Sequence, residues 1–160
     1  MIQLKLKNKK GQLNVNSKEV KDILGIRSDI DFVQDISNTI NQKNIMVFDC
    51  KLSESIFSKE IAKQLIEESA GEIESFFDLF FEDVKAFLKD TTDEIEAELQ
   101  DIYLVDNIRC CFDIYSINDD FTDFKFVFIA SFKETRIAVL ENLAKIVSKR
   151  QLAGASKFYC

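Results

Sequence analysis

Two stretches in which apolar and other residues alternate place the strongest constraint on how this chain folds. Each stretch carries one side of large apolar or small residues: Ile108, Cys110, Phe112 and Ile114 in the first, and Phe124, Phe126, Phe128, Ala130 and Phe132 in the second. A period of two indicates β-strands with that side in a core. If Phe112 faces Phe128, the whole side is apolar, whereas a slip of one residue sets Asp113 against Phe128. The sequence therefore predicts an antiparallel hairpin of fixed register.

The start of the chain predicts a second hairpin. Ile2, Leu4 and Leu6 alternate with polar residues, and Leu13 and Val15 resume the alternation after the turn residues 8–11. Gly11 suits the positive φ that such turns require. A further run, IMVFDC at 45–50, is predicted to be a buried strand.

Capping residues and apolar spacing predict the helices. Ser17 is expected to cap a short helix, 18–24, that Gly25 ends, and Ser28 to cap a second with Ile30, Val33, Ile36 and Ile40 on one stripe. Three central helices are expected at 58–68, 70–89 and 92–101. The capping boxes Ser69-x-x-Glu72 and Thr91-x-x-Glu94 define the last two. A final helix is expected at 133–150, with Ile137, Leu140, Leu143, Ala144 and Val147 facing inward.

These elements predict one α+β domain over residues 1–160. Its order is an N-terminal β-hairpin with two short helices, a central three-helix segment, and a C-terminal antiparallel hairpin followed by a helix. A chain of 160 residues fits a single domain. No linker rich in proline or glycine interrupts it, although residues 1–50 could form a subdomain.

Composition argues against several chemistries. The chain has no histidine, which removes the usual catalytic triads and the helical di-iron sites, and its four glycines form no phosphate-binding loop. The four cysteines form no C-x-x-C pair and are expected to be reduced and buried. We therefore expect no enzyme activity, no cofactor and no metal.

With no apolar run long enough to span a bilayer and no signal-like segment, we expect no membrane association and a cytoplasmic location, in a bacterial cell or an infected host. Abundant Ile, Lys, Asn and Phe, encoded by AT-rich codons, suggest a low-GC bacterial or phage source.

Charge is concentrated in the middle of the chain. Residues 54–106 hold sixteen acids and four lysines, whereas residues 1–27 hold seven bases and two acids. An acidic helical surface with apolar edges suits a partner protein with a basic, partly apolar face. The candidate partner-binding residues are Glu74, Asp78, Glu82, Glu94, Glu98, Phe81 and Leu79. The expected function is that of a non-catalytic binding protein, of an inhibitor, immunity, anti-defence or phage assembly type. Self-association also stays open.

The alternative is a DNA-binding regulator. Residues 15–40 read as two helices separated by Leu24-Gly25, and the pattern Ser17-x-Glu19-Val20-x-x-x-Leu24-Gly25 resembles the N-terminal modules of phage antirepressor and Rha-type regulators. This resemblance implies a phage-type transcriptional regulator. The candidate nucleic-acid contacts are Lys9, Lys10, Lys18, Lys21 and Arg27. Against it, the second helix would carry Asp29, Asp31 and Asp35 where phosphates call for cations, so nucleic acid is the less favoured partner.

Overall fold

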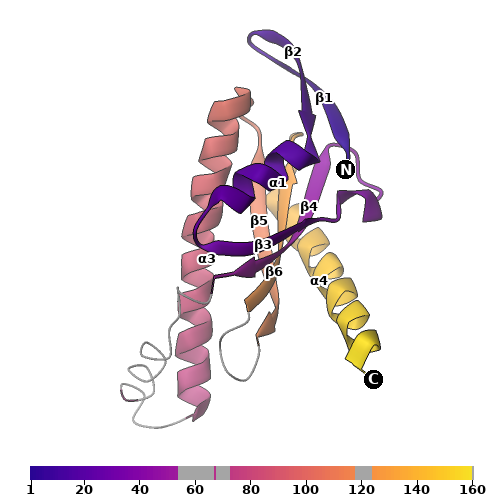
Figure 1. Cartoon of the computed structure of the whole chain (residues 1–160). Coiled ribbons are helices and arrows are strands. Elements are labelled where there is room, and N and C mark those ends of the chain that lie inside the picture. Colours follow the sequence, from indigo (N-terminus) through magenta and orange to yellow (C-terminus); the bar gives the residue numbers. More distant parts are fainter. Residues whose placement is uncertain (54–66, 68–72, 118–123, 160) are drawn as a thin grey trace.

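The structure, a computed structural model, describes residues 1–53, 67, 73–117 and 124–159, and within the two long helices it describes side chains from Asp78 onward and as far as Gly154. Its elements are β1 (Gln3–Asn8), β2 (Gly11–Asn16), α1 (Ser17–Ile26), β3 (Ile30–Asp35), the 3-10 turn η1 (Ser37–Thr39), β4 (Ile45–Leu52), α3 (Ile73–Tyr103), β5 (Arg109–Ile117), β6 (Phe124–Ser131) and α4 (Ile137–Tyr159). Within the described residues, β1 and β2 form their own antiparallel sheet, and the other strands form an antiparallel sheet in the order β3-β4-β6-β5 (Figure 1). The predicted α+β class is confirmed.

The C-terminal hairpin has the predicted register. Phe112 pairs with Phe128 and Ile114 with Phe126, and an irregularity follows between Ile114 and Ser116. On the other side of β6, Phe128 pairs with Phe48 of β4, so three phenylalanines lie in one row across the sheet. The predicted strand at 45–50 is also confirmed and extends to Leu52.

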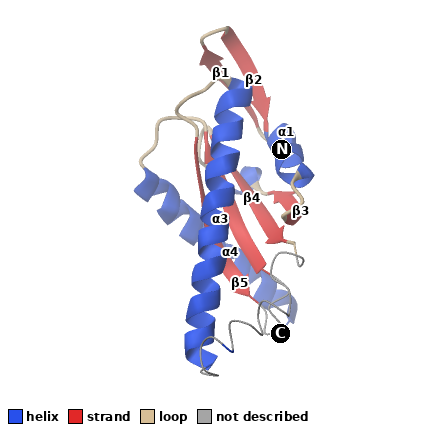
Figure 2. Cartoon of the chain, turned by 90° about the vertical axis from the view of Figure 1, so that its left-hand side faces the viewer, coloured by secondary structure: helices blue, strands red, loops and turns tan. Residues whose placement is uncertain are grey.

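The four-stranded sheet is buried on both faces. Phe48, Phe126 and Phe128 belong to a core shared with α1, α3 and the N-terminal hairpin. The opposite face, with Val127 and Ile129, packs against α4. Figure 1 shows the resulting layers, with α1 and α3 on one side of the sheet and α4 on the other, and Figure 2 shows α3 running along the length of the sheet.

The expected last helix is present, but its limits differ. It begins at Ile137 rather than at 133, and it extends to Tyr159 rather than ending at 150. Leu140, Ala144 and Val147 are buried as predicted, whereas Ile137 is 42% exposed.

The predicted second short helix is wrong, because residues 30–35 form strand β3. The misleading signal is the three-residue spacing of Ile30 and Val33, which suits one side of a helix. In a regular strand this spacing would place the two side chains on opposite faces. A register shift between Ile30 and Phe32 inserts an extra residue, so Ile30 and Val33 both reach the core shared with α1.

The predicted break before residue 92 is also wrong, because 73–103 is one helix. Thr91 is only 4% exposed and lies within α3 instead of capping a new helix. The buried positions recur every three or four residues without a phase change: Phe80, Val84, Leu88, Thr91, Ile95, Leu99 and Tyr103. Burial of this continuous stripe outweighs the local capping preference. The expected helix at 58–68, apart from Glu67, and the box at 69–72 lie outside the described residues.

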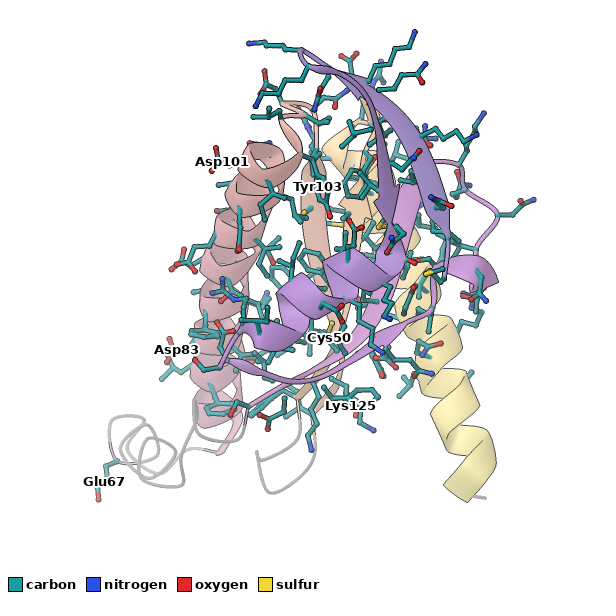
Figure 3. The ribbon with its side chains drawn as sticks, turned by 45° about the horizontal axis from the view of Figure 1, so that its top comes forward. Cys50, Glu67, Asp83, Asp101, Tyr103 and Lys125 are labelled. Carbon is teal, nitrogen blue, oxygen red and sulfur yellow. The ribbon has the colours of Figure 1, made fainter. Side chains whose placement is uncertain are left out.

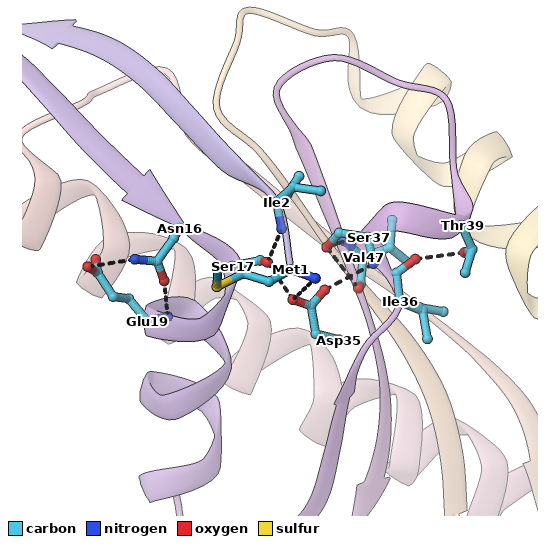
Figure 4. A network of polar contacts seen from close by, with 10 residues as sticks. All are labelled: Met1, Ile2, Asn16, Ser17, Glu19, Asp35, Ile36, Ser37, Thr39 and Val47. Carbon is cyan, nitrogen blue, oxygen red and sulfur yellow. Dashed lines mark hydrogen bonds and ion pairs between the residues drawn. The ribbon is translucent and has the colours of Figure 1, made fainter.

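Helix α1 is capped by Asn16 rather than by Ser17. The Asn16 side chain accepts a hydrogen bond from the Glu19 backbone N–H at 2.8 Å, and Gly25 lies inside the helix, which ends at Ile26. Ser17 is fully buried and has another role (Figure 4). Its hydroxyl accepts from the Ile2 backbone N–H at 2.8 Å and donates to the Asp35 carboxylate, joining the N-terminal strand to β3.

The Asp35 carboxylate makes the fold sensitive to acid. Burial tends to raise its pKa, but hydrogen bonds from the Ser17 hydroxyl and the Ser37 backbone N–H more than compensate, so the pKa is lowered. A lowered pKa favours the folded state above the ordinary value of ~3.9, and this contribution is lost as the pH falls through the folded-state pKa.

We therefore expect Asp35→Asn to be less stable than the wild type near neutral pH and to lose less stability between about pH 5 and about pH 2. Urea unfolding across this range measures both effects. Asp31→Asn, at an exposed position of the same strand, is the control and should follow the wild-type profile. Parallel profiles for wild type and Asp35→Asn would contradict the assignment.

Candidate protein-binding surface

The sequence-predicted binding residues lie on α3, but they do not form one surface. The N-terminal half of α3 exposes Asp78, Leu79, Phe81 and Glu82, and its C-terminal half exposes Glu94 and Glu98. The Glu74 side chain is not among those that the structure describes. Because α3 is continuous, its rotation of ~100° per residue places Glu98 about 160° around the axis from Glu82. These two carboxylates therefore face different sides of the helix.

Glu94 lies on the side of α3 that faces the end of α1. The Arg27 guanidinium donates to Asp29 through two hydrogen bonds of 3.0 Å and to Glu94 at 2.7 Å. The bonds to Asp29, and then to Glu94, raise the pKa of Arg27 although partial burial opposes them. Arg27, a candidate phosphate contact, and Glu94, a candidate partner contact, thus bind each other.

Glu82 faces the opposite side, where α3 also carries its lysines. Lys85 lies 3.1 Å from Glu82 and 4.9 Å above the ring of Phe81, and Lys89 lies 3.5 Å from Asp93. Exposed pairs of this kind contribute little stability. They do reduce the negative charge on this side of the helix.

Between these two sides lies an outer face that the sequence reading did not single out. We define the α3 outer face by Leu79, Asp83, Ala86, Asp90, Ala97 and Asp101, all exposed. Their spacings of seven and eleven residues correspond to about two and three helical turns, so they lie in line. Figure 3 shows Asp83 and Asp101 on the same side of α3, pointing away from the sheet. The spacing would have been visible in the sequence if 73–103 had been read as one helix.

The other basic candidates lie on elements that contact the C-terminal end of α3, where Asn8 of β1 donates to the Tyr103 carbonyl at 2.7 Å and the Tyr103 hydroxyl donates to Glu19 of α1 at 3.2 Å. Lys9 and Lys10 are exposed in the turn of the β1–β2 hairpin, and Lys18 and Lys21 are exposed on α1. The helix-turn-helix prediction is wrong, because β3 stands where the second helix was expected. No recognition helix follows α1 to enter a groove of DNA.

A groove of about 770 Å³ lies between α3, β5 and the start of α4. Its lining includes Phe81, Lys85 and Glu96 of α3, Phe112 of β5, and Glu141 and Lys145 of α4. The sequence reading missed this groove, since it depends on which strand lies at the edge of the sheet.

The three cysteines that the structure describes supply no reactive thiol to these surfaces. Cys50, Cys110 and Cys111 are free and buried. Burial raises the pKa of Cys50 and Cys110 well above the ordinary thiol value and that of Cys111 to about 12. Such thiols stay protonated and unreactive near neutral pH. Cys110 and Cys111, adjacent on β5, point to opposite faces of the sheet.

Searches for two further features gave negative results within the described residues. No group of three or more Cys, Asp or Glu side chains there is arranged to hold a metal ion. None of the helices in the described ranges combines the length and apolar character needed to cross a membrane.

Comparison of the chain with protein-family models, curated proteins and solved structures found no match.

Proposed function

We propose that this protein is a non-catalytic binding protein that docks a basic, partly apolar face of another protein onto the α3 outer face. The observation that carries the proposal is the row of Asp83, Asp90 and Asp101, exposed and in line with Leu79 and two alanines. Binding of this kind would suit an inhibitor, immunity, anti-defence or phage assembly protein.

The physical argument rests on charge and shape. α3 carries ten acids and two lysines between Ile73 and Tyr103. Small side chains at Ala86 and Ala97 leave room for another protein to approach the helix closely, and Leu79, 46% exposed, offers apolar area beside the carboxylates. Like charges along one helix destabilise it slightly, whereas a basic partner relieves that repulsion and associates faster through electrostatic steering.

The test is a charge reversal on the α3 outer face. Asp83→Lys/Asp90→Lys/Asp101→Lys is expected to weaken binding to a partner captured from the source cell and then purified by about tenfold or more, with a weaker salt dependence. Asp22→Lys/Asp31→Lys/Glu134→Lys makes the same charge change at exposed positions away from α3 and should bind like the wild type.

Equal binding by both triple variants would contradict the proposal. A gel-shift assay with duplex DNA at two salt concentrations addresses the rival function. Salt-sensitive binding that is lost on replacing Lys9 and Lys10 would favour a nucleic-acid partner instead.

A further inference from the structure

Among the strands that the structure describes, β5 lies at the edge of the sheet. Hydrogen bonds on both sides of the hairpin show which of its backbone groups face outward. The Phe132 N–H donates to the Asn44 carbonyl at 2.9 Å, so the backbone N–H and C=O groups of the even-numbered β6 residues point toward β4. In an antiparallel ladder, the backbone N–H and C=O groups of the β5 residues opposite them then point away from β6. The Cys110 N–H agrees, because it donates to the Glu96 carboxylate of α3 at 2.9 Å.

Helix α3 satisfies only the first part of this edge. Gln100 donates to the Ile108 carbonyl at 2.8 Å, and Glu96 accepts from Cys110. Phe112 and Ile114 share the outward orientation of Cys110. Among the described residues, no hydrogen bond reaches their outward N–H and C=O groups. These groups form an unpaired stretch of β-edge, the arrangement that accepts an added strand.

The unpaired stretch is recessed. It forms part of the lining of the 770 Å³ groove, with Phe81 and Lys85 of α3 on one side and Ile137 and Lys145 of α4 on the other. Both α3 and α4 pack against β5. The β5 edge of a second copy would be recessed in the same way and so could not reach this one. A single extended segment, which needs only the ~4.8 Å spacing between strands, fits the recess.

The charges along the groove are separated. Gln100 lies beside Ile108 and Glu96 beside Cys110, so α3 runs antiparallel to β5. Lys89 and Lys85, further back along α3, therefore lie beside the later residues of β5. On α4, Lys145 lies one turn beyond Glu141. Lys89 and Asp93 pair with each other at 3.5 Å along this wall of the groove. Beyond that pair, one end of the groove holds Glu96, Asp106 and Glu141 with Arg109, and the other holds Lys85 and Lys145 with Asp113, so the two ends carry net charges of opposite sign.

We propose that this groove binds an extended segment of a partner protein by strand addition to β5 at Phe112 and Ile114. The segment runs antiparallel to β5, with acidic residues first, beside Lys85 and Lys145, then apolar residues, then a basic residue beside the carboxylates. This site is separate from the α3 outer face and does not depend on it.

Peptide selection tests the proposal directly. A random displayed peptide library is selected on the full-length protein and counter-selected on Lys85→Glu/Lys145→Glu. The expected peptides place acidic before basic residues around an alternating apolar stretch. A synthetic peptide of this pattern should bind the double variant about tenfold more weakly than the wild type. Lys18→Glu/Lys149→Glu makes the same charge change at exposed positions outside the groove and should bind normally.

Backbone pairing has its own readout. Hydrogen exchange of the Phe112 and Ile114 amides should slow when the peptide binds. N-methylation of every second peptide residue, in the set whose N–H groups face β5, should abolish binding. Failure to enrich peptides, equal binding by the double variant, or unchanged exchange at these amides would overturn the proposal. So would a dimer of the protein alone in which both amides are already protected. None of these outcomes involves Asp83, Asp90 or Asp101, so the two binding surfaces are tested separately.

Discussion

Replacing Phe128 by alanine is expected to lower the free energy of unfolding by about 3–5 kcal/mol. Phe128 lies on the central strand β6, is 1% exposed, and stands between Phe48 and Phe112 in the row across the sheet. Its removal leaves a cavity that the paired backbones on both sides keep from collapsing, because β6 is hydrogen-bonded to β4 and β5. Urea unfolding followed by circular dichroism measures the change.

Phe32→Ala provides the matched control. Phe32 lies on β3 of the same sheet but is 52% exposed, so the same substitution should cost well under half as much. Similar losses for the two variants would contradict the placement of Phe128 at the centre of the core and the register of the hairpin.

Replacing Ala144 by aspartate is expected to be about as damaging, at ~3 kcal/mol or more, for a different reason. Ala144 is fully buried where α4 packs against the sheet, beside Val127 and Ile129. A carboxylate there would lie unpaired in an apolar layer, where its desolvation is not compensated. The helix would have to move away from the sheet or the fold would be lost.

Ala138→Asp tests the same change on the exposed side of α4 and should alter stability by no more than about 0.5 kcal/mol.

A second readout separates loss of α4 packing from global unfolding. Cys111 belongs to the α4 side of the sheet and Cys50 to the α3 side. In Ala144→Asp, Cys111 should react with a thiol reagent faster than Cys50. Normal stability of Ala144→Asp would show that α4 does not cover this face.

The two hairpins, which follow from the local alternation of apolar residues and from turn residues, were predicted correctly from the sequence. The alternation at 108–132 has one register that keeps Asp113 away from the core, and the structure has that register. The turn at Asn8–Gly11 is also present, and Gly11 adopts a φ of 117°. In these places each residue's preference agrees with that of its neighbours, so no distant contact was needed to decide between alternatives.

The errors occurred where a distant partner overrides a local signal. Ser17 resembles a cap, but its hydroxyl is held by Asp35 and Ile2, and Asn16 caps the helix instead. The spacing of Ile30 and Val33 predicts a helix until β4 is present to pair with residues 30–35. Hydrogen bonding to β4 stabilises the strand, and the local register shift brings both side chains into the core.

The candidate sites show the same division. That the middle of the chain is an acidic helical region with apolar residues follows from composition and spacing, because charge and periodicity belong to the residues themselves. Which acids share a face depends on α3 passing through Thr91 without a break, since only a continuous helix relates the phases of Glu82 and Glu98. The groove depends on strand order. In the order β3-β4-β6-β5, strand β6 pairs with β4 on one side and β5 on the other, and this leaves the outer edge of β5 available. Local preference therefore decided the elements and their charges, and long-range burial and pairing decided the surfaces that those elements form.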